Sequence, residues 1–326
     1  MITNRRRTFY SHTQLATIVF GTLLAGLPLA AQETHHRDLA QHQDQSDRSN
    51  ELTSLLFKTK DGLTLNYVQQ GDPDGPVLVL LHGAGDSWHS YDRVFPLIPS
   101  RYRVYAITLR GHGLSDHPAT GFSAADFAGD ILDFLEQKNI HHATLVGHSL
   151  GSFVAQKVAE LDTNHLDRLV LIGSGPGLSN PSADQSSILS AFSALEDPIP
   201  YTFARDFQAS TIYYPVPAKN FEIWVAEAER VPASTWHGLA QGHREPTEEL
   251  KKIRIPTLVL WGEKDSIFSR SDEDILIHTI PHAQFSVYPE TGHALHWERP
   301  ERFTRELLAF VRDNTAKKST LPSQEK

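Results

Sequence analysis

The amino-acid sequence predicts an α/β fold in which a mostly parallel sheet carries helices on both faces and a separate helical insertion. Continuous apolar runs alternate with amphipathic stretches over most of the chain, as in sheets whose parallel strands are joined by helices. The alternation breaks between Gly175 and Lys252. In addition, one apolar run ends in Gly147-His148-Ser149-Leu150-Gly151, which places a hydroxyl at a corner between two glycines.

Composition narrows the function classes before any motif is considered. The chain has 326 residues, a net charge of -9 and no cysteine. Disulfides, a thiol nucleophile and cysteine metal sites are therefore excluded. The negative charge and the mixing of Lys and Arg with acidic residues argue against a nucleic-acid surface.

The first 50 residues differ from the rest. Arg5-Arg6-Arg7 precedes an apolar run from Leu15 to Leu27 and then small residues, the pattern of a signal peptide. A twin-arginine export route and an uncleaved anchor remain alternatives. We expect a signal peptide over 1–31, a disordered linker over 32–50, a core over 51–174 and 253–314, a helical cap over 175–252, and a flexible tail over 315–326.

The strands are predicted in the following order. Two short runs flank Asp61-Gly62 and predict a hairpin. Five later runs are apolar throughout, as expected of strands covered on both faces: PVLVLLHG, YRVYAITL, HATLVGH, LDRLVLIG and PTLVLWG. The stretch AQFSVYP predicts a last strand.

Two helices between these strands are predicted from their patterns. In SAADFAGDILDFLEQKNI, the side chains of Phe127, Ile131, Phe134 and Leu135 share one face, so this helix packs on the sheet. Asp272 and Asp274 are typical of the first turn of a helix that begins after Ser271.

The predicted cap, residues 175–252, is rich in Phe, Tyr, Trp, Pro and Ala and shows no strand pattern. Most of its aromatic side chains should form the core of the cap itself. Some should face the gap above Ser149 and make an apolar pocket. For this pocket we expect Trp88, His148, Phe207 and Trp224.

Ser149 is the predicted nucleophile. A serine hydroxyl reacts poorly unless it is held exposed beside a base. A sharp strand-to-helix turn holds it there, and Gly147 and Gly151 leave room for the backbone. The first amides of the next helix then favour a developing oxyanion.

Two further strand ends supply partners for Ser149. Asp265 follows the run TLVLWG, and His293 follows Gly292 beyond the last strand. The chain order Ser, Asp, His is that of the hydrolase version of the triad. His293 would take and return the proton of the serine, and Asp265 would orient the imidazole. We expect His296, the rival histidine, to pack on the helix that follows.

The stretch LHGAGDSW, after the third strand, offers backbone amides in a glycine-rich turn. We expect the oxyanion to be bound by the amides of Ala84 and Leu150. His82 and His148 border this region and are expected to hold loops by hydrogen bonds.

Four motifs in order, LHGAGDSW, LRGHGLSD, GHSLG and TGHALHWERP, resemble those of the α/β-hydrolase family from about Leu52 to Val311. The branch with a helical cap includes esterases, haloperoxidase-like hydrolases, epoxide hydrolases and haloalkane dehalogenases. The resemblance implies a mostly parallel, eight-stranded sheet. It argues against the last two activities, because those enzymes use an aspartate where this chain has Ser149. Thr108 departs from the acid that relatives often carry, and we expect it to alter a structural hydrogen bond only.

Together these features predict an exported serine hydrolase that cleaves carboxylic esters of small to medium apolar substrates through an acyl-enzyme. Lactone opening, carbon–carbon bond hydrolysis and perhydrolysis remain open on the same triad. A slow-turnover ligand receptor is the alternative from another class. We expect a small-molecule ester or lactone as partner, no cofactor, no metal, no nucleic acid, no membrane insertion after signal removal, and a periplasmic or secreted location.

Overall fold

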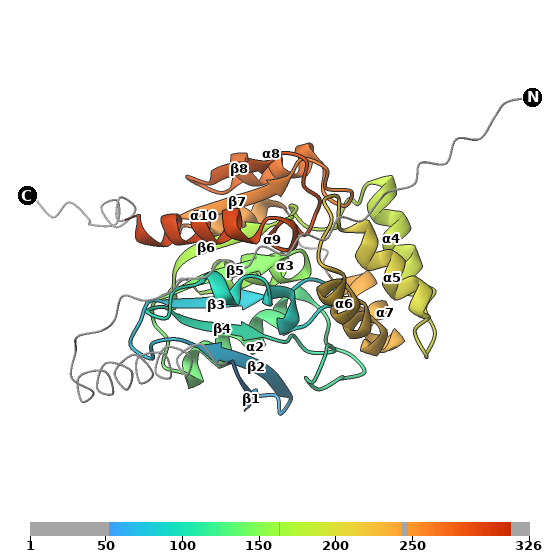
Figure 1. Ribbon diagram of the computed structural model, residues 1–326, viewed down its shortest axis with the longest axis horizontal. Helices are drawn as coiled ribbons and strands as arrows, with labels where there is room; N and C mark the ends of the chain where they lie inside the picture. Colours follow the sequence, from blue (N-terminus) through green and yellow to red (C-terminus); the bar gives the residue numbers. More distant parts are fainter. Residues whose placement is uncertain (1–51, 163, 243–246, 314–326) are drawn as a thin grey trace, which may run out of the picture. The chain divides into compact units, whose positions relative to one another are not determined.

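The structure of the protein is a computed structural model that describes residues 52–162, 164–242 and 247–313 (Figure 1). The predicted signal peptide (1–31), linker (32–50) and C-terminal tail (315–326) lie outside the described residues.

One sheet of eight strands, in the order β1-β2-β4-β3-β5-β6-β7-β8, forms the centre of the fold. β2 pairs antiparallel with β1 and β4, and all other neighbours are parallel. The predicted mostly parallel, eight-stranded sheet is confirmed. The strands are β1 (Thr53–Lys58), β2 (Thr64–Gln70), β3 (Val77–Leu81), β4 (Arg103–Ile107), β5 (Ala143–His148), β6 (Leu166–Ile172), β7 (Thr257–Gly262) and β8 (Gln284–Tyr288).

Each apolar run of the sequence contains a strand. β5 and β7 are buried at every residue, which explains why their sequences do not alternate between polar and apolar. The predicted hairpin joins β1 and β2, and Gly62 in its turn has a φ of 97°, a conformation that glycine adopts without a steric penalty.

Helices cover both faces of the sheet, and each face has its own apolar core. Side chains of α2, α3 and α8 pack on one face, and those of η1, η2, α9 and α10 pack on the other. These elements are η1 (Trp88–Tyr91), η2 (Phe95–Leu97), α2 (Ala124–Gln137), α3 (Leu150–Leu161), α8 (Arg270–Thr279), α9 (Leu295–Glu298) and α10 (Pro300–Arg312).

The start of α8 differs slightly from its prediction. Ser269 accepts a hydrogen bond from the amide of Asp272 in a capping box, so the helix begins at Arg270 rather than after Ser271. Reciprocal bonding between the cap residue and the third helical residue fixes a helix start in this way.

The insertion between β6 and β7 is helical, and none of its described residues is in a strand. It contains α4 (Ala183–Ser193), α5 (Tyr201–Ser210), α6 (Ala218–Arg230), α7 (Ala233–Gly242) and η3 (Thr247–Lys252). The helices α4 to α7 group at one end of the sheet in Figure 1. The rings of Phe192, Phe203, Phe207 and Trp236 pack together there, with centroids 4.6 to 6.3 Å apart.

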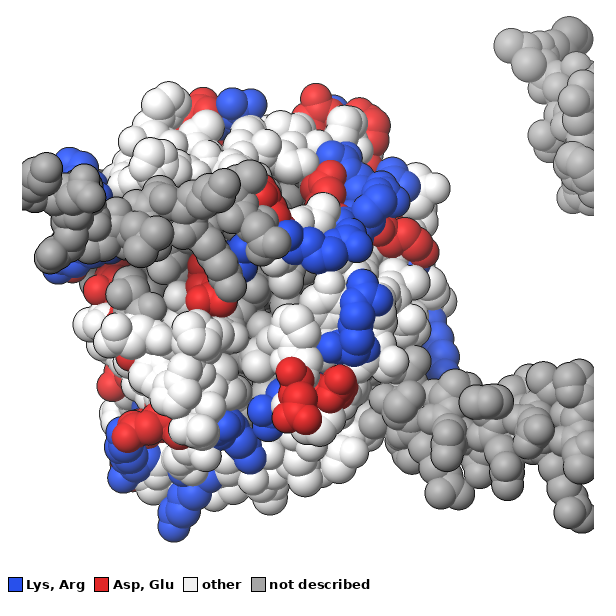
Figure 2. Space-filling view, turned by 90° about the vertical axis from the view of Figure 1, so that its left-hand side faces the viewer, with Lys and Arg blue, Asp and Glu red and all other residues white. Residues whose placement is uncertain are grey.

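Charges are mixed on the surface. On the face shown in Figure 2, Lys and Arg side chains are interspersed with Asp and Glu side chains, and neither sign covers the face alone. Among the described residues, no helix combines the length and the apolar character needed to cross a bilayer.

Candidate active site

Ser149 sits at the corner between β5 and α3 with φ 51° and ψ -114°. This positive φ is strained for a residue with a side chain and costs on the order of 1–2 kcal/mol. A Cβ atom on Gly147 would lie 2.1 Å from the carbonyl oxygen of Gly151, and one on Gly151 would lie 2.5 Å from that of Leu81. Both glycines are therefore required for the turn that presents the hydroxyl.

Asp265 and His293 are brought together from loops after β7 and β8. Nδ1 of His293 and Oδ2 of Asp265 are 2.8 Å apart, and both side chains are buried. The other oxygen of Asp265 accepts hydrogen bonds from the amides of Ile267, at 2.8 Å, and Phe268, at 3.0 Å. Because Oδ1 is held by two amides, Oδ2 is fixed in the direction of the imidazole, and Nε2 is the ring nitrogen that stays unbonded.

Two neighbouring residues at the end of β6, Ile172 and Gly173, contact Ser149 and His293 respectively. The amide of Ser149 donates to the carbonyl of Ile172 across 3.0 Å, and the next residue, Gly173, lies against the imidazole. The ring of His148, next to the serine, is centred 4.8 Å from the ring of His293. Nε2 of His293 is buried and has no hydrogen-bond partner among the described residues. The lone pair of Nε2 is thus available to a hydrogen-bond donor. Hydrogen bonds between catalytic groups often tighten only when substrate binds.

The amides of Ala84 and Leu150 lie beside Ser149. All three residues line one cavity, and neither amide donates a hydrogen bond to another described residue. Gly85 follows with φ 77°, and a Cβ there would lie 2.8 Å from the Trp236 ring of the cap. Two amides without acceptors beside a serine hydroxyl are the arrangement expected of a candidate oxyanion site.

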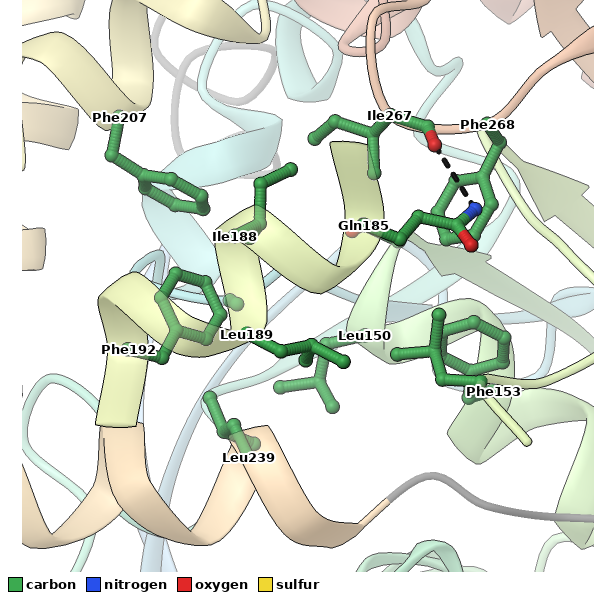
Figure 3. A pocket seen from close by; sticks show the side chains of 13 residues that line it. Leu150, Phe153, Gln185, Ile188, Leu189, Phe192, Phe207, Leu239, Ile267 and Phe268 are labelled. Carbon is green, nitrogen blue, oxygen red and sulfur yellow. Dashed lines mark hydrogen bonds between the residues drawn. The ribbon is translucent and has the colours of Figure 1, made fainter. Parts of the chain in front are cut away.

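The cavity above Ser149 is small, with a volume of about 70 Å³. Its lining is apolar except for Ser149 and Gln185 (Figure 3). The side-chain amide of Gln185 is already used, because it donates to the carbonyl of Ile267 across 3.1 Å. The lining residues are Ala84, Ser149, Leu150, Phe153, Leu178, Gln185, Ile188, Leu189, Phe192, Phe207, Leu239, Ile267 and Phe268.

Of the four side chains expected in the pocket, only Phe207 lines this cavity, and the expectation is wrong for Trp88, His148 and Trp224. Trp224 is fully buried and stacks on Trp297 with ring centroids 3.8 Å apart. Trp88 stacks on the ring of the next residue at 3.7 Å. His148 is 2% exposed and packs between other rings beneath the site. The partners of Trp224 and His148 are distant in the sequence, whereas that of Trp88 is the next residue.

A second buried carboxyl lies close to the candidate triad. Burial raises the pKa of Asp86 to about 8. Its oxygens accept hydrogen bonds from Gln208, at 2.9 Å, and from Ser90, at 3.3 Å. Nδ1 of His148 is 4.0 Å from it, and burial holds the pKa of His148 well below its ordinary value. Both groups are therefore largely uncharged at neutral pH, which avoids an unpaired buried charge.

Of the two histidines expected to hold loops by hydrogen bonds, His82 does so, whereas neither ring nitrogen of the buried His148 has a hydrogen-bond partner among the described residues, so that expectation is wrong for His148. Nε2 of His82 accepts from the amide of Leu109 across 2.9 Å. His296 lies on α9, where its Nε2 is 3.1 Å from the hydroxyl of Ser90. Burial lowers the pKa of His296 to about 3. A ring that is buried, neutral and tied to Ser90 has a structural role.

The family model of the alpha/beta hydrolase fold matches residues 76–300. This stretch carries Ser149, Asp265 and His293 together with the turn at Ala84. The chain belongs to the α/β hydrolase fold family. The predicted resemblance to esterases and haloperoxidase-like proteins is confirmed by the relatives of this α/β hydrolase.

Two of these relatives are nearly full-length matches. A bifunctional esterase/perhydrolase of Acinetobacter calcoaceticus is 29% identical over 282 residues, which cover 78% of this chain and 98% of the relative. A non-heme chloroperoxidase of Kitasatospora aureofaciens is also 29% identical, with the same shares of the two chains covered. Among solved structures, an esterase from Rhodococcus sp. ECU1013 has a TM-score of 0.70 at 25% identity and covers 79% of this chain and 98% of its own.

No group of three or more His, Cys, Asp or Glu residues in the described part of this α/β hydrolase is placed to hold a metal ion. Ala84, Ser149 and Leu150 line the cavity, and the ring of Phe268, another lining residue, packs on the imidazole of His293.

Four residues of this α/β hydrolase that shape the site were not identified from sequence: Gly173, Gln185, Gln208 and Glu298. Gly173 gives room to the imidazole, and the two glutamines contact the loops of Asp265 and Ala84. Glu298 accepts from the amide of Gly292 and from two cap amides, at 213 and 214. A signal existed for Gln185 alone, because Ser182 and Gln185 have the spacing of a capping box.

Proposed function

We propose that this α/β hydrolase cleaves carboxylic esters of apolar acids by nucleophilic catalysis at Ser149. The observation that carries the proposal is the pair of Asp265 and His293, whose Nε2 is unbonded, together with the strained turn at Ser149. Strained turns that persist in a fold are found at functional sites.

The geometry supports the following sequence of steps. His293 accepts the proton of the Ser149 hydroxyl as its oxygen bonds to the carbonyl carbon of the ester. The carbonyl oxygen gains the negative charge, which the amides of Ala84 and Leu150 stabilise. The tetrahedral species collapses, the alcohol leaves with the proton from His293, and an acyl-serine remains. Water, deprotonated by His293, then attacks the acyl carbon, and the acid leaves as His293 returns the proton to the oxygen of Ser149. Asp265 stabilises the imidazolium in both halves.

The lining of the cavity supports an apolar acyl group. Apart from the nucleophile, its one polar side chain is Gln185, and both ends of that amide are bonded within the protein. A sugar or charged substrate would lose its hydration without gaining partners, and this costs free energy. The esterase named among the relatives is consistent with this substrate class.

Perhydrolysis is the second candidate, because one relative is named both esterase and perhydrolase. In this reaction hydrogen peroxide replaces water as the nucleophile that attacks the acyl-serine, and the products are the peracid and the free hydroxyl of Ser149. Lactone opening and carbon–carbon bond hydrolysis would use the same acyl-enzyme.

The test is turnover of 4-nitrophenyl acetate and butyrate by the wild type and by Ser149→Ala. We expect sustained turnover that falls by roughly 10³-fold or more in the variant with its fold intact. A fluorophosphonate should label Ser149, located by peptide mass mapping, and Ser187→Ala, an exposed serine of α4, should label like the wild type. Stoichiometric labelling without turnover would instead indicate the ligand receptor.

We also propose that the enzyme acts outside the cytoplasm. Support comes from Arg5-Arg6-Arg7, the apolar run after it and the small residues before Gln32. Protein recovered from the periplasm or medium of a producing strain should begin near Gln32. Recovery of a purely cytosolic protein with Met1 in place would contradict export.

A further inference from the structure

The cavity above Ser149 is not the only hollow that the cap borders. A groove on the outside of the cap, between α4 and α5, is lined by Ile188, Ala191, Phe192, Pro200, Thr202, Phe203, Asp206 and Phe207. Ile188, Phe192 and Phe207 also line the cavity. These three side chains are therefore a shared wall, one side chain thick, between the inner cavity and the outer groove.

We propose that this outer groove binds the distal end of a long, unbranched acyl chain whose ester carbonyl is at Ser149. The inference rests on the proposed esterase function and assigns its substrate class: esters of aliphatic acids too long for the inner cavity. The groove is a second subsite, which the chain enters by displacing side chains of the shared wall.

The two ends of the cavity indicate which part of the substrate lies there. Phe268 lines one end and packs on the ring of His293 with centroids 5.8 Å apart. The leaving alcohol must depart beside His293, because this residue protonates it. The acyl chain therefore extends toward the opposite end, where Phe192 and Phe207 lie in Figure 3. That end adjoins the groove.

The wall is made of side chains that can move. Ile188 and Phe207 are only partly buried. The ring of Phe207 contacts those of Phe192 and Trp236 edge-on and stacks on that of Phe203. Rotation of such side chains is fast compared with turnover. When a methylene chain takes the place of one of these rings, it packs against the remaining rings, so the protein loses little packing.

The groove itself suits a hydrocarbon tail. Phe203, Pro200 and Ala191 supply apolar surface beyond the wall, and Asp206, with an exposed carboxylate, lies at the rim. Each methylene transferred from water to such a surface can raise kcat/KM by up to about fourfold. Asp206 is paired with Arg205 at 3.0 Å, and a tail that ended in a carboxylate would have to pass the apolar wall without its hydration, so the preferred acids are monocarboxylic.

The experiment fills the groove without touching the cavity. Ala191 is exposed and lines only the groove, so Ala191→Trp should block it. We expect kcat/KM for 4-nitrophenyl decanoate to fall by at least tenfold while that for the butyrate stays within twofold. Thr202→Trp, at another exposed groove position, should reproduce the effect if the first variant is poorly produced. Ala209→Trp, exposed on α5 and outside both linings, is the matched control.

A binding measurement separates this inference from the esterase proposal. Calorimetry should show decanoate binding to Ser149→Ala at least tenfold more tightly than to Ser149→Ala/Ala191→Trp, with butyrate unaffected. Equal effects on both acids, or no effect on decanoate, would overturn the groove even if the butyrate ester is turned over. Failure of the wild type to turn over any ester, with the decanoate difference intact, would remove the esterase proposal and leave the groove as a fatty-acid site.

Discussion

Gln208 of the cap donates its side-chain amide to Asp86 across 2.9 Å and to the carbonyl of Gly85 across 3.3 Å. Both Gln208 and Asp86 are 1% exposed. The bonds join α5 of the cap to the turn that carries Ala84, one of the two candidate oxyanion donors. The cap therefore takes part in holding the reaction centre, in addition to covering it.

Gln208→Met should test that role, because methionine keeps the volume and removes the donor. The turn loses its anchor, so we expect kcat/KM to fall about tenfold, mostly through kcat, and stability to fall by about 1–3 kcal/mol. An inhibitor that forms an oxyanion on Ser149, such as a trifluoromethyl ketone, should lose a similar factor in affinity.

Arg205→Gln provides the control for Gln208, since Arg205 is an exposed residue of the same helix. It should leave both readouts unchanged. If Gln208→Met weakens stability but leaves the inhibitor's affinity intact, the glutamine is a packing residue and does not position the oxyanion donors.

Gly173 leaves room for the imidazole of His293, and a substitution there provides the second test. A Cβ there would lie 2.7 Å from Nδ1 and 2.9 Å from Cε1 of His293, and its φ is 51°. Gly173→Ala should push the imidazole away from Ser149, so we expect kcat to fall by 10²-fold or more, as small misplacements of reacting groups can cost this much. The positive φ adds about 1–2 kcal/mol of destabilisation.

Gly62→Ala is the control that separates backbone strain at a positive φ from a steric clash with His293. Gly62 has a φ of 97°, and a Cβ added there would have no other atom within 4 Å. Chemical denaturation should show a comparable loss of stability, whereas ester turnover should stay at the wild-type level. Comparable turnover losses in both alanine variants would show that general destabilisation, and not contact with His293, lowers the activity.

The pH dependence of stability should carry the signature of Asp86. Burial raises its pKa to about 8, against an ordinary value of 3.8. Between these values the folded protein holds a proton that the unfolded chain has released. The contribution of Asp86 to stability is thus present at low pH and is lost as the pH rises to about 8, by up to about 1.4 kcal/mol per pH unit.

Asp86→Asn isolates this contribution, because the amide is neutral throughout and still offers an acceptor to Gln208. The free energy of unfolding, measured in urea between pH 5 and pH 9, should fall more steeply for the wild type than for the variant up to about pH 8. Above that pH the two curves should run in parallel. Curves that are parallel over the whole range would mean that Asp86 is ionised in the fold.

Residues that act through their local sequence could be predicted, and residues that act across the fold could not. The strands follow from apolar runs, and the Ser149 turn follows from two glycines that the backbone requires. Asp265 and His293 were identifiable because both follow strand ends, and parallel strands bring these ends to one edge of the sheet.

The side chains of the pocket were predicted less well, because their positions depend on contacts between segments that are distant in the sequence. Composition indicated an aromatic cap, but Trp224 is occupied by Trp297, a partner 73 positions away in the numbering, stacked 3.8 Å from it. Phe207 and Trp224 are both large aromatic residues of the cap, and only the packing of α5 and α6 decides which of them lines the cavity with Ser149. Likewise, Gln208 reads as a surface residue of a helix until its contact with Asp86 is known.

Gln185 connects the cap to the loop of Asp265, and its two ends can be tested separately. Its oxygen accepts from the amide of Ser182 across 2.9 Å to cap α4, and its nitrogen donates to the carbonyl of Ile267 across 3.1 Å. Ile267 in turn donates its amide to Oδ1 of Asp265. Gln185→Glu preserves the cap and removes the donor, so the loop is loosened while α4 still begins at the same residue.

Ser182→Ala is the reciprocal change, because it removes the cap and leaves the donor to Ile267 in place. It should cost about 1 kcal/mol of stability with kcat unchanged. For Gln185→Glu we expect kcat for 4-nitrophenyl butyrate to fall by roughly three- to tenfold with little change in KM, since orientation of the imidazole matters in the transition state. A fall in kcat of equal size in both variants would assign the effect to the position of α4, and the tether to Asp265 would then have no catalytic role.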